Sequence, residues 1–239
     1  MILERRLQFN IPELLEQNGH LFENIESGGS KISLIHLAEF MQAYNAAMKA
    51  ISTKLEVLDD EFQLLHKHNP IHHLESRVKS PKSIHNKMIK DRLALSLENI
   101  RENVYDIAGI RVICNFLDDI YAVENLLIKQ ADVTLIKRKD YIAEPKENGY
   151  RSLHIVVKVP VFLSSKTEEI PVEIQLRTIA MDYWASLEHK LRYKSNGNTQ
   201  KYAAMLLDCA NALSETEREM LYIRECIEEY KQEEVLACI

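Results

Sequence analysis

Glycine and proline are scarce in this chain, with six of each among 239 residues. Because these two residues most often interrupt helices, long stretches without them favour helical structure. The segment from Lys31 to Asn69 contains neither, and its apolar residues recur every three or four positions. This pattern predicts one long amphipathic helix that ends at Pro70. Beyond Gly197 both residues are again absent, which predicts one or two C-terminal helices.

Paired cysteines and long apolar runs are also lacking. The four cysteines show no Cys-X-X-Cys spacing, so we expect reduced thiols, with Cys114 in the core of an apolar strand. No apolar run approaches the length needed to span a membrane, and the first residues lack the apolar stretch of a signal peptide. We therefore expect a cytoplasmic protein that does not contact membranes.

Charge is unevenly distributed along the chain. The formal net charge is −6, which argues against a general nucleic-acid coat. Cations nevertheless cluster in residues 77–92 and 137–151. A basic pocket on an acidic protein fits a small polyanion better than a long one. RNA binding by these loops is a weaker alternative, and a strong dependence of affinity on salt would be its signature.

The middle of the chain predicts alternating strands and helices. Segments rich in Val and Ile predict four strands, the last two joined as a hairpin across residues 164–169: 110–116, 133–139, 153–159 and 172–177. Asp118 and Asp119 offer caps for a helix to about Lys129, and a further helix opens at Thr178. The predicted plan is a helical segment (1–69), a mixed segment (70–195) and a helical segment (196–239). This is an α+β fold with a central sheet wrapped by helices.

Two carboxylates occupy unusual positions beside predicted core strands. Asp106 precedes the strand that begins near Ile110, and Glu173 interrupts the apolar run Val172–Ile174. Carboxylates are rarely placed next to a core without a reason. Together with the nearby cations they suggest a Mg²⁺ site for phosphorylated substrates. The alternatives are a helix cap for Asp106 and a sheet-edge ion pair for Glu173.

The first basic segment offers two cationic faces. Arg77 and Lys79 share a face if the chain is extended, and Lys87 and Lys90 share one on a helix. Ser83 is the N-cap that we predict for this helix. Two such faces converging on one point would grip a triphosphate. The alternative is a solvated charged surface.

The second basic segment combines cations, two tyrosines and a glycine. The cations are Lys137, Arg138, Lys139, Lys146 and Arg151, interleaved with Tyr141 and Tyr150. Gly149 permits close backbone approach or a positive φ, and the ring that follows it can stack on a base. The alternative is a plain turn before the strand. Four histidines (His66, His68, His72 and His73) also invite a metal, but exposed side chains at a helix end are the favoured interpretation, as is a core position for Trp184.

Four of these segments, taken in order, resemble one known family. RVKSPKSIHNKM, YDIAGIRVIC, KRKDYIAEPKENGYRSLH and VEIQLRTIAMDYWASLEHKLRYK are similar to the synthetase domain of RelA/SpoT alarmone synthetases. The resemblance covers about half the chain, and four motifs in the right order are far more specific than any one of them. The short chain with helices on both sides resembles the small, synthetase-only members, and it implies a nucleotidyltransferase-like mixed sheet with long terminal helices.

The resemblance implies an activity and a set of site residues. The activity is Mg²⁺-dependent transfer of pyrophosphate from ATP to the 3′-hydroxyl of GDP or GTP, which gives (p)ppGpp and AMP. The implied metal and catalytic residues are Asp106 and Glu173, the latter also taking the hydroxyl proton. The implied ATP-binding residues are Arg77, Lys79, Ser83, Lys87 and Lys90. The implied GDP/GTP-binding residues are Lys139, Lys146, His154, Asp182 and Tyr150, whose ring stacks on guanine.

Two further expectations concern the acceptor base and the oligomeric state. Asp182 stands where some relatives have Asn, yet a carboxylate can accept hydrogen bonds from guanine N1–H and N2–H₂. The small synthetases are homotetramers, and the apolar residues of both terminal helices favour self-association. The alternatives are the same fold with another acceptor (an adenine nucleotide or the 3′ end of tRNA) and a binding module for alarmone or RNA without turnover.

Overall fold

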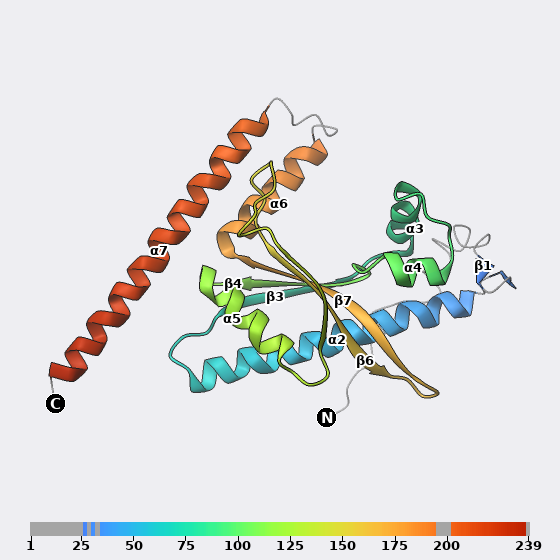
Figure 1. Cartoon of the computed structure of the whole chain (residues 1–239), viewed down its shortest axis with the longest axis horizontal. Coiled ribbons are helices and arrows are strands. Elements are labelled where there is room, and N and C mark those ends of the chain that lie inside the picture. Colours follow the sequence, from blue (N-terminus) through green and yellow to red (C-terminus); the bar gives the residue numbers. More distant parts are fainter. Residues whose placement is uncertain (1–25, 28–29, 32–33, 195–201, 238–239) are drawn as a thin grey trace. The chain divides into compact units, whose positions relative to one another are not determined.

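The computed structural model describes residues 26–27, 30–31, 34–194 and 202–237, and its centre is a five-stranded sheet in the order β3-β4-β7-β6-β5 (Figure 1). The strands of this sheet are β3 (Ile71–Val78), β4 (Ala108–Cys114), β5 (Thr134–Asp140), β6 (Leu153–Phe162) and β7 (Thr167–Thr178). A separate antiparallel pair consists of β1 (Glu26–Ser27) and β2 (Ser30–Lys31). The helices are α2 (Leu34–Leu65), α3 (Pro81–Lys90), α4 (Leu97–Asn103), α5 (Leu117–Ile128), α6 (Ile179–Lys194) and α7 (Ala203–Ala237). The predicted α+β class with a helix-flanked mixed sheet is confirmed.

The chain divides into two compact units, and the division cuts through four strands of the sheet. The first unit comprises the described residues of Met1–Ile51 with Ser76–Gly109 and Lys158–Glu173. The second comprises Ser52–Glu75, Ile110–Val157 and the described residues of Ile174–Ile239. Each unit buries its own set of large apolar side chains, among them Tyr44, Ile84 and Met88 in the first and Ile113, Ile120 and Leu127 in the second.

Both long helices that the scarcity of glycine and proline predicts are present, but α2 ends earlier than predicted. Helix α2 stops at Leu65, five residues before Pro70, and its buried residues recur every three or four positions, as in Leu37, Met41, Tyr44 and Met48. The C-terminal segment forms one helix, α7, rather than two. Within the part of the chain that the structure describes, no helix is both long and apolar enough to cross a membrane.

The predicted hairpin is present and longer than expected. Strands β6 and β7 are neighbours in the sheet, and four residues join them. The Leu163 amide donates to the Lys166 carbonyl at 2.8 Å and closes the turn. In β7 the buried residues Val172, Ile174 and Leu176 alternate with polar ones, as the period of two in a strand requires.

Four local features differ from the sequence-based expectations. Strand β3 and helix α4 were not predicted. The N-cap of α3 is Ser80 and not Ser83, because Ser80 Oγ accepts from the Ser83 amide and Pro81 starts the helix with its fixed φ. At α5 the cap residue is Phe116, and its amide donates to the Asp119 carboxylate at 2.9 Å from within the first turn.

Candidate active site

Asp106 is the centre of the first charged cluster. It lies two residues before β4 and accepts a hydrogen bond from Lys79 Nζ at 2.6 Å and from Lys87 Nζ at 2.8 Å. The Lys79 amide donates to the Ile107 carbonyl at 2.7 Å, which fixes the end of β3 beside Asp106. Lys87 approaches from α3. We call Asp106, Lys79 and Lys87 the Asp106 cluster.

The cluster is charged and accessible. Burial opposes ionisation of Asp106, but the hydrogen bonds and charges of Lys79 and Lys87 outweigh it and hold the pKa of this carboxyl below its ordinary value. The side chains of Asp106, Lys79 and Lys87 keep 27%, 19% and 32% of their surface exposed. Two ammonium groups face one carboxylate, so this cluster carries a net positive charge and is suited to an anion. Asp106 lies ahead of a strand, so the alternative of a helix cap is wrong.

The other residues of the first basic segment are less confined. Arg77 in β3 and Lys90 at the end of α3 are exposed. Ser83 Oγ lies 2.9 Å from Ser80 Oγ in the first turn of α3. The predicted convergence of two cationic segments is therefore observed for Lys79 and Lys87, one from each segment.

Glu173 is half-buried in β7, the strand next to β4 in the sheet. Among the described residues no group of three or more His, Cys, Asp and Glu side chains could hold a metal. Mg²⁺ in nucleotide sites needs only one or two carboxylates, because phosphate oxygens and water complete its shell. An ionised, half-buried Asp106 and a half-buried Glu173 fit this donor set. The shared Mg²⁺ site stays a prediction.

A second polar cluster is centred on Tyr150. Its hydroxyl lies 2.8 Å from His154 Nε2, and the Lys146 ammonium lies over the rings of Tyr150 and Tyr141, at 4.6 and 4.5 Å from their centroids. These residues belong to the loop 141–152 and the start of β6. Three of the predicted GDP/GTP-binding residues, Lys146, Tyr150 and His154, are thus brought together.

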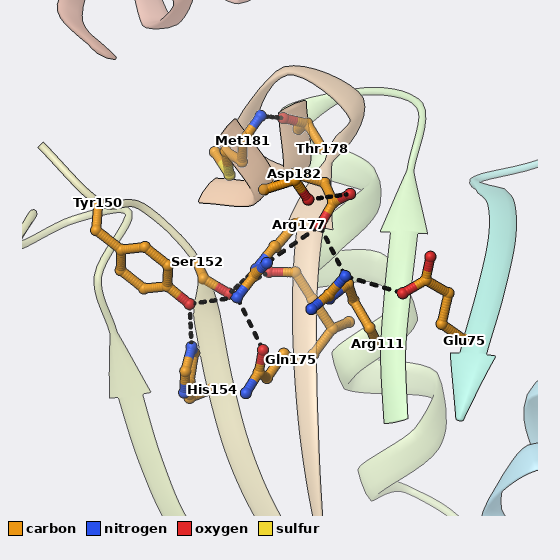
Figure 2. A network of polar contacts seen from close by, with 12 residues as sticks. Glu75, Arg111, Tyr150, Ser152, His154, Gln175, Arg177, Thr178, Met181 and Asp182 are labelled. Carbon is orange, nitrogen blue, oxygen red and sulfur yellow. Dashed lines mark hydrogen bonds and ion pairs between the residues drawn. The ribbon is translucent and has the colours of Figure 1, made fainter. Parts of the chain in front are cut away.

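Arg177 joins Tyr150 to Asp182 (Figure 2). Its Nη2 donates to the Tyr150 hydroxyl at 2.6 Å and to Gln175 Oε1 at 2.8 Å, and its Nη1 donates to Asp182 Oδ1 at 3.1 Å. Its Nε donates to Ser152 Oγ at 3.4 Å. The side chain is only 7% exposed. We call Arg177 with these four partners the Arg177 network.

Asp182 has a second cationic neighbour. Arg111 Nη1 lies 3.3 Å from Asp182 Oδ1 and donates to Glu75 at 2.8 Å (Figure 2). Both arginines therefore face the same oxygen of Asp182. The other oxygen, Oδ2, accepts one long hydrogen bond from Ser186 Oγ at 3.5 Å.

Gly149 decides the path of the loop 141–152. Its φ is +89°, and a Cβ at this position would lie 2.6 Å from the Cβ of Ala210 in α7. Arg151 stabilises this contact between the loop and α7, because it donates to the Ala210 carbonyl at 3.4 Å and to Asn211 Oδ1 at 3.2 Å. Both predicted reasons for a glycine, close approach and positive φ, are confirmed, and the alternative of a plain turn is insufficient.

Lys139 stands apart from these clusters. It is exposed on β5, the last strand of the sheet order. Its neighbour Arg138 pairs with Glu124 through two hydrogen bonds of 2.7 and 3.0 Å. No described contact joins Lys139 to Tyr150, so its predicted role remains a prediction.

Trp184, His68 and Cys114 have structural roles. Trp184 is 6% exposed, packs with Ala185 and Ala210, and donates its indole N–H to the Leu206 carbonyl at 2.9 Å. His68 pairs with Asp119 at 2.7 Å. Burial keeps the pKa of the Cys114 thiol far above its ordinary value, as expected for a core cysteine.

Arg177 and Arg111 were not predicted from the sequence as site residues. The signal for Arg177 was present, because Glu173, Gln175 and Arg177 alternate with buried apolar residues in β7 and so mark one polar strand face. Arg111 interrupts β4 in the same manner, between the buried Ile110 and Val112.

The chain is similar to proteins of one known family. The family model described as "Region found in RelA / SpoT proteins" matches residues 76–198. GTP pyrophosphokinase YwaC of Bacillus subtilis is 48% identical over 158 residues, which are 66% of this chain and 75% of that protein. GTP pyrophosphokinase YjbM of the same organism is 39% identical over 191 residues, 80% of this chain and 89% of that protein.

Solved structures extend the similarity to the fold. Small alarmone synthetase 2 from Bacillus subtilis superposes with a TM-score of 0.71 at 43% identity, over 77% of this chain and 97% of that one. Small alarmone synthetase 1 from the same organism, bound to its product pppGpp, gives a TM-score of 0.73 at 37% identity, over 79% and 96%. The chain belongs to the RelA/SpoT family and has the fold of its small alarmone synthetases.

Proposed function

We propose that this protein synthesises (p)ppGpp by transferring the β,γ-pyrophosphoryl group of ATP to the 3′-hydroxyl of GDP or GTP. The observation that carries the proposal is the Asp106 cluster, an ionised carboxylate between two lysines within the residues that the family model matches. The named relatives are GTP pyrophosphokinases, and one structural neighbour was solved with pppGpp bound.

The donor nucleotide binds at the first basic segment. Lys79 and Lys87 supply cations to the ATP phosphates, and Arg77, Ser83 and Lys90 extend the same surface. The lysines are flexible point charges, so they can turn from Asp106 to phosphate oxygens as ATP arrives. When the lysines turn to the phosphates they release Asp106, and the β-phosphorus comes to lie near this carboxylate.

The transfer step then needs positioning and one proton acceptor. The acceptor's 3′-oxygen attacks the β-phosphorus, the bond from that phosphorus to the α–β bridging oxygen breaks, and AMP leaves with the bond's electron pair. Glu173 takes the hydroxyl proton as general base. Mg²⁺ held by Asp106 and Glu173 with the phosphates would neutralise the charge that develops on the phosphate oxygens.

The acceptor nucleotide binds at the second cluster. Tyr150 stacks on guanine, Asp182 accepts from its N–H groups, and Lys139, Lys146 and His154 contact its phosphates. The Lys146 ammonium above the two tyrosine rings is a cation that acceptor phosphates would draw away.

We also propose a cytoplasmic, homotetrameric protein with a catalytic segment of 70–195 between helical segments 1–69 and 196–239. Helix α7 supports self-association, because it exposes large apolar side chains, including Met220, Tyr222, Ile223 and Ile227. Between 49% and 66% of the surface of each of these residues is exposed, and a group of large apolar residues exposed to this extent is typical of a surface that another protein covers.

Product chromatography tests the activity directly. Labelled ATP is incubated with GDP, GTP, ADP or tRNA in separate reactions, with and without Mg²⁺. We expect AMP and a 3′-pyrophosphorylated guanine nucleotide only with GDP or GTP and only with Mg²⁺. A product from ADP or tRNA would support the alternative acceptors, and no product from any would support a binding module.

A variant of Glu173 tests the general base. Glu173→Gln keeps the shape and removes the proton acceptor, so turnover should fall by about 10²–10⁴-fold. The matched control is Glu169→Gln, an exposed residue of the same strand, which should leave turnover unchanged. If Glu173→Gln released AMP at the normal rate, the assignment would be wrong.

A further inference from the structure

Arg177 is the most connected buried charge in the described part of the second unit. Four of its five N–H groups have partners: one reaches Ser152, one Asp182, and two from Nη2 reach Tyr150 and Gln175. Its guanidinium carbon also lies 5.2 Å from the centroid of the Tyr150 ring. Only a planar fork of donors can satisfy partners in these different directions at once.

The two outer partners of Arg177 are the two residues assigned to the guanine base. Tyr150 comes from the loop 141–152 and Asp182 from the first turn of α6. Arg177 itself is the penultimate residue of β7, a central strand of the sheet. The rigid element therefore fixes one aromatic ring and one carboxylate that would otherwise depend on a loop and a helix end.

The network also selects which oxygen of Asp182 faces a ligand. Arg177 and Arg111 both engage Oδ1, at 3.1 and 3.3 Å. Within the described residues, the hydrogen bond that Oδ2 accepts is the long one of 3.5 Å from Ser186 Oγ. A carboxylate oxygen with acceptor capacity to spare can receive the N1–H and N2–H₂ donors of guanine.

We propose that Arg177 is a positioning residue for guanine selection, which holds the Tyr150 ring and presents Asp182 Oδ2 to the 2-amino edge of the acceptor base. This inference rests on the proposed function only in taking guanine as the base. Arg177 acts through its two partners and need not touch the nucleotide. Discrimination between bases then depends on a buried side chain that acts through Tyr150 and Asp182.

The test compares equilibrium affinity for GDP with that for IDP, which lacks the 2-amino group. Calorimetry is performed on the full chain, wild type and Arg177→Lys, a change that keeps the charge and removes the fork. We expect the wild type to prefer GDP by roughly tenfold, the value of one hydrogen bond to a charged group. In Arg177→Lys the preference should fall toward one, mainly through weaker GDP binding, while affinity for an ATP analogue stays unchanged.

The control is Arg224→Lys, which removes the fork of an arginine in the same unit. The described partners of Arg224 include Asp118, at 2.6 Å, and the Phe116 ring, and they do not include Tyr150. Arg224→Lys should keep the wild-type ratio. If Arg177 only stabilised the fold, Arg177→Lys would lower the fraction of protein that binds nucleotide and would leave the ratio of GDP affinity to IDP affinity unchanged. That result, or a wild-type ratio of one, would overturn the proposal.

A second variant keeps the proposal testable. If Arg177→Lys fails to fold, Tyr150→Phe removes the hydroxyl that accepts from Arg177 and keeps the ring, and the GDP:IDP ratio should again fall; an unchanged ratio would overturn the proposal. Because the readout is binding, it is independent of turnover. Absence of AMP release in the wild type would refute the proposed function, while an unaltered ratio in the variants refutes only this inference.

Discussion

The Asp106 cluster and the Arg177 network are built from similar charges and held in different ways. In the Asp106 cluster two flexible lysines share one carboxylate, and all three side chains keep about a fifth to a third of their surface exposed. In the Arg177 network a single planar guanidinium with a 7% exposed side chain joins four partners. The first depends on charge and can exchange its partners, whereas the second depends on geometry and cannot.

This difference suits the two kinds of substrate group. Phosphates are recognised by charge, and a lysine that has lost one anion can turn to another at little cost. A purine base is recognised by the direction of a few hydrogen bonds and by one aromatic face, so its partners must be fixed in advance. Under the proposed assignment, mobile charge lies where phosphates would bind and the rigid network lies where the base would be chosen.

Among the variants that separate the two groups of residues, Asp106→Asn should reduce activity most. The substitution removes the anion between Lys79 and Lys87 and a proposed Mg²⁺ ligand, so turnover should fall by about 10²–10⁴-fold in a steady-state assay. Asp132→Asn is the control, because it breaks another 2.8 Å carboxylate–lysine pair, with Lys54, and neither residue is a proposed site residue. Normal turnover in Asp106→Asn would remove the Asp106 cluster from the mechanism.

An intermediate effect is expected from Gly149→Ala. The new Cβ would lie 2.6 Å from that of Ala210, and φ of +89° disfavours any side chain, so unfolding free energy should fall by about 1–3 kcal/mol. The weakened loop should also bind GDP less tightly. Both quantities are measured by urea unfolding and calorimetry.

The matched control for Gly149 is Gly109→Ala in β4. There the nearest atom to an added Cβ is the Arg77 carbonyl oxygen at 3.8 Å, an ordinary contact. If Gly109→Ala cost as much stability as Gly149→Ala, close packing of the loop 141–152 against α7 would not be the cause.

The smallest effect is expected from Glu217→Gln on α7. Burial raises the pKa of Glu217 above its ordinary value of 4.5, against the hydrogen bond from Thr178 and the charge of Arg151. The folded state therefore holds this proton more tightly than the unfolded state, and the contribution of Glu217 to stability is lost as pH rises from 4.5 through the raised value.

The Glu217→Gln protein lacks this loss, so its stability relative to wild type should increase between acid and neutral pH. Urea unfolding at several pH values measures the difference, with the exposed Glu219→Gln as control. A constant difference across the range would show that Glu217 does not titrate in the folded protein as its burial implies.

Much of the fold could be predicted because it follows from short-range patterns. The period of α2, the absence of glycine and proline from it, and the Val- and Ile-rich runs of β5 to β7 are local properties. The Ser83 cap was wrong because two serines lie within one turn, and only the φ that Pro81 fixes makes Ser80 the last extended residue. Strand β3 was missed because its histidines and charges hide the period of two.

The candidate residues themselves could also be named from sequence, since carboxylates and cations stand out within apolar or ordered segments. Their partners could not. Arg177 and Arg111 were visible as interruptions of strands, but pairing with Asp182 depends on which strands are neighbours.

The family, the helical and strand periods, and the charged side chains that can do phosphoryl chemistry follow from residue type and spacing alone. The folded chain was needed to show that Lys79 and Lys87 meet at Asp106, that Ala210 leaves no room beside Gly149, and that one buried guanidinium holds both Tyr150 and Asp182. The reason is physical. Hydrogen bonds and van der Waals contacts act over a few ångströms in space, and the residues that they join here lie up to about 60 positions apart in the chain.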